Sequence, residues 1–145
     1  MKSDMFNILL VEDDSDHAHL IMRELKKSGV FNTINWVEDG SDAIDYLKCS
    51  GKYKDNSIAS LGLILLDIKL PKLNGLEVLE WIKGNTPTKD IPVVMLTTSS
   101  DIKDIEKSYS LGANLYVEKS VENFVKRIKN IGLYCQYLST QNDAE

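Results

Sequence analysis

Short runs of apolar residues alternate along this chain with longer segments in which apolar residues recur every three or four positions. The short runs are typical of strands buried on both faces of a parallel sheet, and the periodic segments are typical of helices with one apolar face. The predicted strands are residues 8–11, 34–37, 63–66, 93–96 and 115–117. The predicted helices are residues 15–29, 42–48, 75–83, 101–111 and 121–138.

Capping and turn residues set the predicted boundaries. Ser15 or Asp16 is the expected N-cap of the first helix, and Gly29 is expected to end it. Residues 50–62 are polar, contain Gly and Ser, and show little periodicity. We therefore predict a long surface loop there.

Strand and helix alternate five times. Right-handed crossovers between parallel strands place the connecting helices on both faces of a sheet. This order predicts an α/β fold with a doubly wound, five-stranded parallel sheet and five helices. The 145 residues are enough for one such domain, which we expect over 1–138, with a flexible tail at 139–145 and no effector domain.

Charge and hydropathy exclude several kinds of protein. The net charge of -5 disfavours sequence-independent binding to nucleic acid, which needs clustered Lys and Arg. No apolar run is long enough to span a bilayer, and residues 1–7 lack the apolar core of a signal peptide. We expect a cytoplasmic protein that binds neither nucleic acid nor membranes directly.

The cysteines and histidines do not form a metal-binding pattern. Cys49 and Cys135 have neither CxxC spacing nor a second pair, so neither a disulfide framework nor a zinc site is expected. His17 and His19 are two residues apart and fall on different faces of the predicted helix, whereas helical metal pairs lie one turn apart. We expect both histidines to be surface residues.

Polar residues that suit one common chemistry follow four of the predicted strands. Glu12 and Asp13 follow the first strand, Asp67 the third, Thr97 the fourth, and Lys119 lies just beyond the fifth. The carboxyl ends of parallel strands meet at one edge of the sheet, where ligands bind in open α/β folds. One such residue alone is more often a helix cap or part of a solvated loop. Four strand ends with complementary groups predict a shared site.

The residue types at this edge suit a divalent cation and a phosphoryl group. Carboxylates repel one another unless a hard cation lies among them, and oxygen ligands with room for water favour Mg²⁺. Asp67 is the candidate nucleophile, because an aspartate forms an aspartyl phosphate when cations offset the phosphoryl charge. Lys119 would supply a mobile positive charge, and Thr97 would donate a hydrogen bond. A charged group arriving there would also move the hydroxyl, so the site suits a switch.

The segments around these residues resemble the receiver domains of two-component response regulators. The matching segments are Ile8-Leu9-Leu10-Val11-Glu12-Asp13, Leu65-Leu66-Asp67-Ile68-Lys69-Leu70-Pro71 with Asn74-Gly75, Pro92-Val93-Val94-Met95-Leu96-Thr97, Gly112-Ala113-Asn114 and Tyr116-Val117-Glu118-Lys119. Each piece alone is weak, but the ordered set is highly specific. The resemblance implies a flavodoxin-like fold with strand order 2-1-3-4-5.

The resemblance also implies roles for the acidic residues. Asp67 is expected to accept a phosphoryl group from the phosphohistidine of a sensor histidine kinase. Glu12, Asp13 and Asp67 are expected to bind Mg²⁺ through their carboxylates. The main-chain carbonyl of Lys69 is expected to complete the protein ligands of the metal.

The same resemblance implies how the signal leaves the site. Thr97 and Lys119 are expected to contact the phosphoryl group. Tyr116 matches an aromatic that moves between exposed and buried positions on activation, although a half-buried strand tyrosine without that role fits as well. Output is expected through onward phosphotransfer or a target protein, by way of the fourth helix, fifth strand and fifth helix. That face also permits a homodimer.

Finer motifs point to one branch of the family. They are Leu70-Pro71-Lys72-x-Asn74-Gly75, Leu96-Thr97-Thr98-Ser99 and Ser108-Tyr109-x-Leu111-Gly112-Ala113-Asn114. Together with the long loop before the third strand, they are similar to small stand-alone regulators that accompany bacterial phytochrome-type histidine kinases. Such a kinase is therefore an expected partner, with light as one upstream context.

Two positions depart from the family pattern. Ser120 follows Lys119, where family members usually carry Pro after a cis peptide bond. A cis bond to a non-Pro residue costs about 3 kcal/mol, so the bond is either trans or held cis under strain. Lys69 is an unusual basic residue two positions after the acceptor, and we expect it to affect how long the phosphate lasts.

Other functions fit less well. An aspartyl phosphatase usually needs a second Asp where this chain has Lys69, and a dinucleotide-binding oxidoreductase needs a Gly-rich turn where the chain has Glu12-Asp13-Asp14-Ser15. The serious alternative is a receiver-like scaffold that binds partners without being phosphorylated. Such scaffolds commonly lack the acceptor or the lysine, and this chain has both.

Overall fold

The computed structural model describes residues 6–27, 31–119, 126–127, 129–131, 133–134 and 137. Its sheet consists of β1 (Phe6–Val11), β2 (Phe31–Val37), β3 (Leu61–Leu66), β4 (Val93–Thr97) and β5 (Leu115–Glu118). All neighbouring strands pair in parallel, in the order β2-β1-β3-β4-β5. The predicted sheet and its strand order are confirmed.

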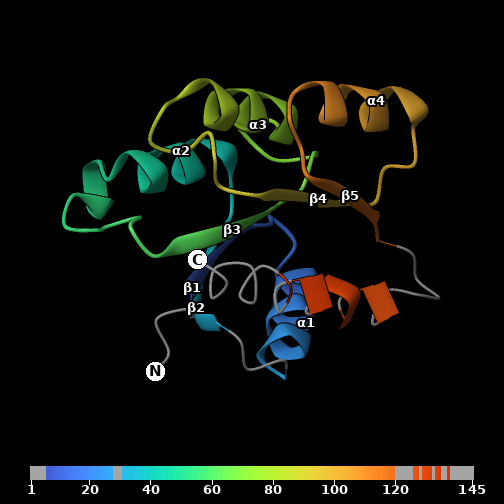
Figure 1. Cartoon of the computed structure of the whole chain (residues 1–145), viewed down its shortest axis with the longest axis horizontal. Coiled ribbons are helices and arrows are strands. Elements are labelled where there is room, and N and C mark those ends of the chain that lie inside the picture. Colours follow the sequence, from blue (N-terminus) through green and yellow to red (C-terminus); the bar gives the residue numbers. More distant parts are fainter. Residues whose placement is uncertain are drawn as a thin grey trace.

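Helices cover both faces of the sheet, as Figure 1 shows. The helices are α1 (Ser15–Lys26), α2 (Gly40–Lys48), α3 (Gly75–Gly84) and α4 (Ile102–Ser110), with a short 3-10 helix, η1 (Gly51–Tyr53), after α2. In Figure 1, α2, α3 and α4 lie above the sheet and α1 lies below it. Within the described residues, no helix is long and apolar enough to cross a membrane.

The C-terminal segment agrees with the predicted fifth helix as far as it is described. The described residues between 126 and 137 are helical, and Figure 1 places them on the same side of the sheet as α1. The predicted helix start at Val121, the peptide bond between Lys119 and Ser120, and the predicted tail at 139–145 lie outside the described residues.

Several predicted boundaries were wrong. The N-cap of α1 is Asp14 rather than Ser15 or Asp16, because its side chain accepts hydrogen bonds from the backbone N–H groups of Asp16 and His17. The predicted loop at 50–62 contains η1 and the first residues of β3. Strand β2 begins before the apolar run that predicted it, because pairing with β1 extends the strand through polar positions.

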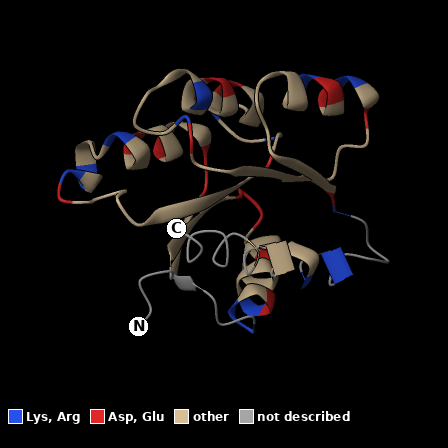
Figure 2. Cartoon of the chain, in the orientation of Figure 1, with Lys and Arg blue, Asp and Glu red and all other residues tan. Residues whose placement is uncertain are grey.

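The hydrophobic core has one half on each face of the sheet. In β1, Leu9 packs into the cluster under α2 and α3, and its neighbour Leu10 packs into the cluster under α1. In β3, Ile64 and Leu65 divide in the same way. Each fully buried Leu or Ile side chain stabilises the fold by about 1.5–3 kcal/mol. Burial on both faces explains why these strands are continuous apolar runs, and Figure 2 shows the charged residues mainly on the helices and loops.

The strand register brings the candidate site residues to one edge. Val11 pairs with Leu66, and the next N–H along β3, that of Asp67, donates to the carbonyl of Val11 at 3.2 Å. On the far side of β3, the N–H of Lys119 donates to the carbonyl of Thr97 at 2.7 Å. The side chains that follow β1, β3, β4 and β5 therefore emerge next to one another.

Candidate functional site

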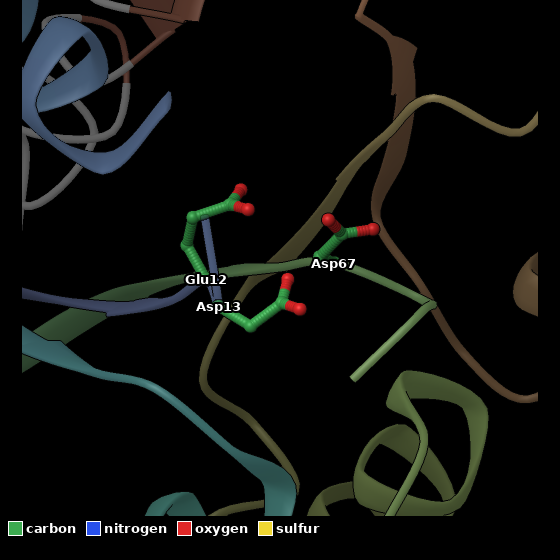
Figure 3. A group of neighbouring side chains, drawn as sticks. All are labelled: Glu12, Asp13 and Asp67. Atoms are coloured by element: carbon green, nitrogen blue, oxygen red, sulfur yellow. The ribbon is translucent and has the colours of Figure 1, made fainter. Parts of the chain in front are cut away.

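Three carboxylates converge at the carboxyl edge of the sheet. Glu12 and Asp13 follow β1, Asp67 follows β3, and each offers a carboxylate oxygen within 4.8 Å of the others. Figure 3 shows the three side chains pointing toward a common space. Glu12 and Asp67 are buried, whereas Asp13 is exposed. The cluster is therefore open to solvent on the side of Asp13.

Lys119 places a buried ammonium group among these carboxylates. Its Nζ donates to Oδ2 of Asp67 at 3.1 Å and makes a short contact with Oε1 of Glu12. Only 3% of the Lys119 side chain is exposed. A buried charge is stable only when it is paired and hydrogen-bonded. The lysine and the two carboxylates therefore depend on one another.

The electrostatics of the cluster favour a further cation. Burial raises the pKa of Glu12, Lys119 opposes that rise, and the charge of Asp67 adds to it. A carboxylate whose pKa is raised by burial and by a like charge holds its negative charge at a cost. A cation bound among Glu12, Asp13 and Asp67 would reduce that cost.

The donor set fits magnesium better than a transition metal. All three acidic side chains offer oxygen, and the exposed side leaves room for water, which Mg²⁺ keeps in protein sites. The N–H of Lys69 donates to Oδ1 of Asp67 at 3.3 Å, so the chain folds back toward the carboxylate after β3. The carbonyl of Lys69 as a further ligand stays a prediction.

Thr97 and Tyr116 are connected through Ser99, for which no role was predicted from the sequence. Thr97, the last residue of β4, is fully buried, and its Oγ1 accepts a hydrogen bond from the N–H of Ser99 at 3.3 Å. The hydroxyl of Tyr116 donates to the carbonyl of Ser99 at 2.6 Å. Burial raises the pKa of this half-buried tyrosine. Ser99 thus links the end of β4 to β5.

Two more residues contact the site that the sequence reasoning did not assign to it. His17 was expected to be a surface residue, but its Nδ1 lies 3.2 Å from Nζ of Lys119. Trp36, at the end of β2, donates from Nε1 to the carbonyl of Glu12 at 2.7 Å. His17 was recognisable in principle, because it lies in the first turn of the helix that follows Glu12 and Asp13. Nothing in the sequence signals the Trp36 contact.

Gly75 allows the helix after the acceptor to approach it closely. The N–H of Gly75, the first residue of α3, donates to the carbonyl of Ile68 at 2.7 Å. A Cβ atom on Gly75 would lie 1.9 Å from the carbonyl oxygen of Asp67. Only glycine leaves space for the backbone of Asp67 at this position.

Comparison with known proteins identifies relatives along almost the whole chain. The response regulator receiver domain family model matches residues 8–129. The probable methanogenesis regulatory protein FilR2 of Methanothrix harundinacea is 40% identical over 133 residues, 90% of this chain and 84% of FilR2. Response regulator Rcp1 of Synechocystis is 40% identical over 126 residues, 86% of this chain and 84% of Rcp1.

Solved structures agree with these relatives. The crystal structure of the phosphorylated cyanobacterial phytochrome response regulator RcpA has a TM-score of 0.82 at 40% identity, and the match covers 88% of this chain and 91% of RcpA. The Mn²⁺-bound form of Rcp1 has a TM-score of 0.82 at 39% identity, with 87% and 91% covered. The resemblance seen in the sequence is confirmed, and the chain belongs to the response regulator receiver domain family.

Proposed function

We propose that this chain is a response regulator in which Asp67 receives a phosphoryl group from the phosphohistidine of a sensor histidine kinase, with the help of Mg²⁺. The groups that surround Asp67 are the main support for this proposal. The carboxylate of Asp67 lies beside two further carboxylates and 3.1 Å from the ammonium group of Lys119. This is a nucleophile next to the cationic charge that an incoming phosphoryl group needs.

In the proposed transfer, an oxygen of Asp67 attacks phosphorus. A P–O bond to Asp67 forms as the P–N bond of the donor phosphohistidine breaks, and the freed imidazole keeps the electron pair. The ammonium group of Lys119 turns from the carboxylate of Asp67 to one phosphoryl oxygen. The hydroxyl group of Thr97 donates a hydrogen bond to another phosphoryl oxygen. Bound Mg²⁺ supplies further positive charge for the phosphoryl oxygens. The chain would thus act as a signalling switch and catalyse only its own phosphorylation and dephosphorylation.

The hydrogen bonds behind Thr97 suit a conformational response. When the Thr97 hydroxyl moves toward a phosphoryl group, it leaves the N–H of Ser99, and the loop that accepts the Tyr116 hydroxyl shifts with it. Tyr116 would then change position on β5. The adjoining helix α4 exposes Ile102 and Tyr109, which suits contact with a target protein or a second copy.

The relatives support the choice of partner. RcpA is described as a cyanobacterial phytochrome response regulator in its phosphorylated form, and Rcp1 has been solved with bound Mn²⁺. A phytochrome-type histidine kinase is therefore the donor that we propose, with a downstream phosphotransfer or target protein as the receiver of the signal. We further propose one receiver domain over 1–138, acting in the cytoplasm.

Acetyl phosphate, a small phosphodonor, tests this function without the kinase. The purified chain is incubated with it in the presence and absence of Mg²⁺, and the intact mass is measured. We expect a gain of one phosphoryl group that requires Mg²⁺. No gain from this donor or from phytochrome-type kinases would favour the phosphorylation-independent scaffold.

Magnesium is expected to stabilise the folded chain. A ligand that binds only the folded state at a hundredfold excess over its Kd adds about 2.7 kcal/mol to the free energy of unfolding. Asp13→Asn should remove most of this gain, because it takes away one of the three carboxylates of the cluster. Asp13 is exposed, so the change leaves no buried charge unpaired. Asp16→Asn, a change in an exposed carboxylate of α1, should keep the gain. Thermal unfolding with and without Mg²⁺ measures each effect, and an equal shift in all three proteins would argue against the site.

Lys69 is expected to prolong the life of the aspartyl phosphate. Its exposed side chain begins two residues after the acceptor and is long enough to cover a phosphoryl group against attack by water. Lys69→Ala should therefore shorten the half-life severalfold, on the order of a kcal/mol of barrier. The half-life is read from the decay of the phosphorylated mass after the donor is removed. Decay at the parent's rate would contradict this role.

A further inference from the structure

The ammonium group of Lys119 has three contacts, two to carboxylates and one to an imidazole nitrogen. Two of them, to Glu12 and Asp67, involve carboxylates that the proposed function assigns to the metal and the phosphoryl group. The third is Nδ1 of His17, 3.2 Å away on α1. An ammonium group has three hydrogen-bond donors, so these three contacts match its full donor capacity when Nδ1 of His17 is an acceptor.

The first turn of α1 fixes the position of His17. Its backbone N–H donates to Oδ1 of the N-cap Asp14 at 3.1 Å. Its ring nitrogen Nδ1 lies 3.8 Å from Oδ2 of Asp14 and 3.9 Å from Oε2 of Glu12. The imidazole is only about one-third exposed, with 35% of its side chain accessible. The same cap that starts the helix therefore directs this ring toward the lysine, which lies 102 residues away in the sequence.

His17 differs from the other two acceptors in what happens to it on phosphorylation. Under the proposed function, the carboxylate of Asp67 becomes an acyl phosphate, and Glu12 turns toward a cation. Both then become poorer acceptors for the ammonium group. His17 is assigned no part in either event, so phosphorylation leaves its ring available as an acceptor for Lys119.

We propose that His17 is a positioning residue that holds the Lys119 ammonium group at the site while its carboxylate partners are taken up by the metal and the phosphoryl group. The proposal rests on the proposed function, because it assigns Lys119 to the phosphoryl oxygens. To accept a hydrogen bond from Lys119, Nδ1 of His17 must present its lone pair, so the neutral ring carries its proton on Nε2.

Two substitutions separate this role from a structural one. His17→Leu removes the acceptor and keeps much of the bulk, whereas His17→Asn keeps an amide oxygen near the place of Nδ1. The control is His19→Leu on the same helix: His19 is exposed and its ring lies edge-on to Trp36. At saturating Mg²⁺, we expect His17→Leu to lower the rate of phosphorylation by acetyl phosphate by about tenfold or more, the effect of one hydrogen bond from a charged donor.

The phosphorylation rates of the variants, taken together, test the proposed role of His17. His17→Asn should recover most of the rate, His19→Leu should match the parent, and the Mg²⁺ affinity should be the same in all four proteins because His17 is not a proposed metal ligand. A His17→Leu rate equal to the parent's would overturn the proposal while leaving the proposed function intact. A loss that His17→Asn does not restore would also overturn it, since bulk or helix packing would then be the cause.

A measurement on the unphosphorylated chain is independent of the proposed function. Isotope-edited NMR of the histidine side chains at about pH 8.5, where imidazole is neutral, reports which ring nitrogen carries the proton. We expect Nδ1 of His17 to be unprotonated and its resonance to move in Lys119→Met, while the signals of His19 stay in place. A proton on Nδ1, or a resonance that ignores the lysine substitution, would refute the contact even if the parent is never phosphorylated.

Discussion

Asp67→Asn is expected to abolish the Mg²⁺-dependent gain of a phosphoryl group. An amide is a far weaker nucleophile than a carboxylate, and it removes one of the three proposed carboxylate ligands. The rate of phosphorylation should fall by more than about a thousandfold, as in enzymes that lose a nucleophile. Intact mass after incubation with acetyl phosphate and Mg²⁺ measures the effect.

The control for this variant is a carboxylate far from the site. Asp90 is exposed and lies in the loop before β4, at the opposite end of that strand from Thr97. Asp90→Asn should be phosphorylated like the parent. The fold of Asp67→Asn should persist, because Lys119 keeps its contact with Glu12. A phosphorylated Asp67→Asn protein would show that another residue is the acceptor.

Gly75→Ala is expected to damage both the fold and the site. The added methyl group would meet the carbonyl oxygen of Asp67 at 1.9 Å and Cα of Ile68 at 2.7 Å, and both are backbone atoms that cannot rotate away. Relief requires α3 to move off β3 or the Asp67 backbone to shift. We expect the free energy of unfolding to fall by about 2–4 kcal/mol and phosphorylation to slow in the molecules that stay folded.

Gly84 provides the matched control on the same helix. It is the last residue of α3, and a Cβ atom there would have no neighbour within 4 Å. Gly84→Ala should stabilise the chain slightly, by about 0.5–1 kcal/mol, because alanine favours the helix and restricts the unfolded state. Denaturant unfolding of the two variants compares them directly. Equal stabilities would mean that the approach of α3 to Asp67 is looser than the structure shows.

The sheet and the acidic cluster could be predicted because both follow from strong local signals. A strand buried on both faces must be a continuous apolar run, as Leu63 to Leu66 is, and the residue after it must emerge at the ligand-binding edge. The convergence of Glu12, Asp67 and Lys119 then follows from the parallel strand order alone. The resemblance to receiver domains gave the order, and the structure agrees with it.

The roles that were not predicted from the sequence depend on contacts that leave no periodic pattern in the sequence. Asp14 rather than Ser15 caps α1, because either residue type suits a cap and only the backbone conformation decides between them. His17 reads as a surface histidine until Lys119 is placed beside it. Ser99 links Thr97 to Tyr116 mainly through backbone atoms, to which any residue type contributes equally. Side-chain identity therefore carried little information about these three roles.

The central claim is that Asp67 carries the phosphoryl group, and the most direct measurement locates it. The chain is phosphorylated with acetyl phosphate and Mg²⁺ and treated with borohydride, which reduces an aspartyl phosphate to homoserine, and peptides are sequenced by mass spectrometry. We predict homoserine at position 67 and nowhere else. Homoserine at Asp13 or another carboxylate, or a phosphoryl group that resists reduction because it is on a histidine or a hydroxyl, would contradict the proposed function.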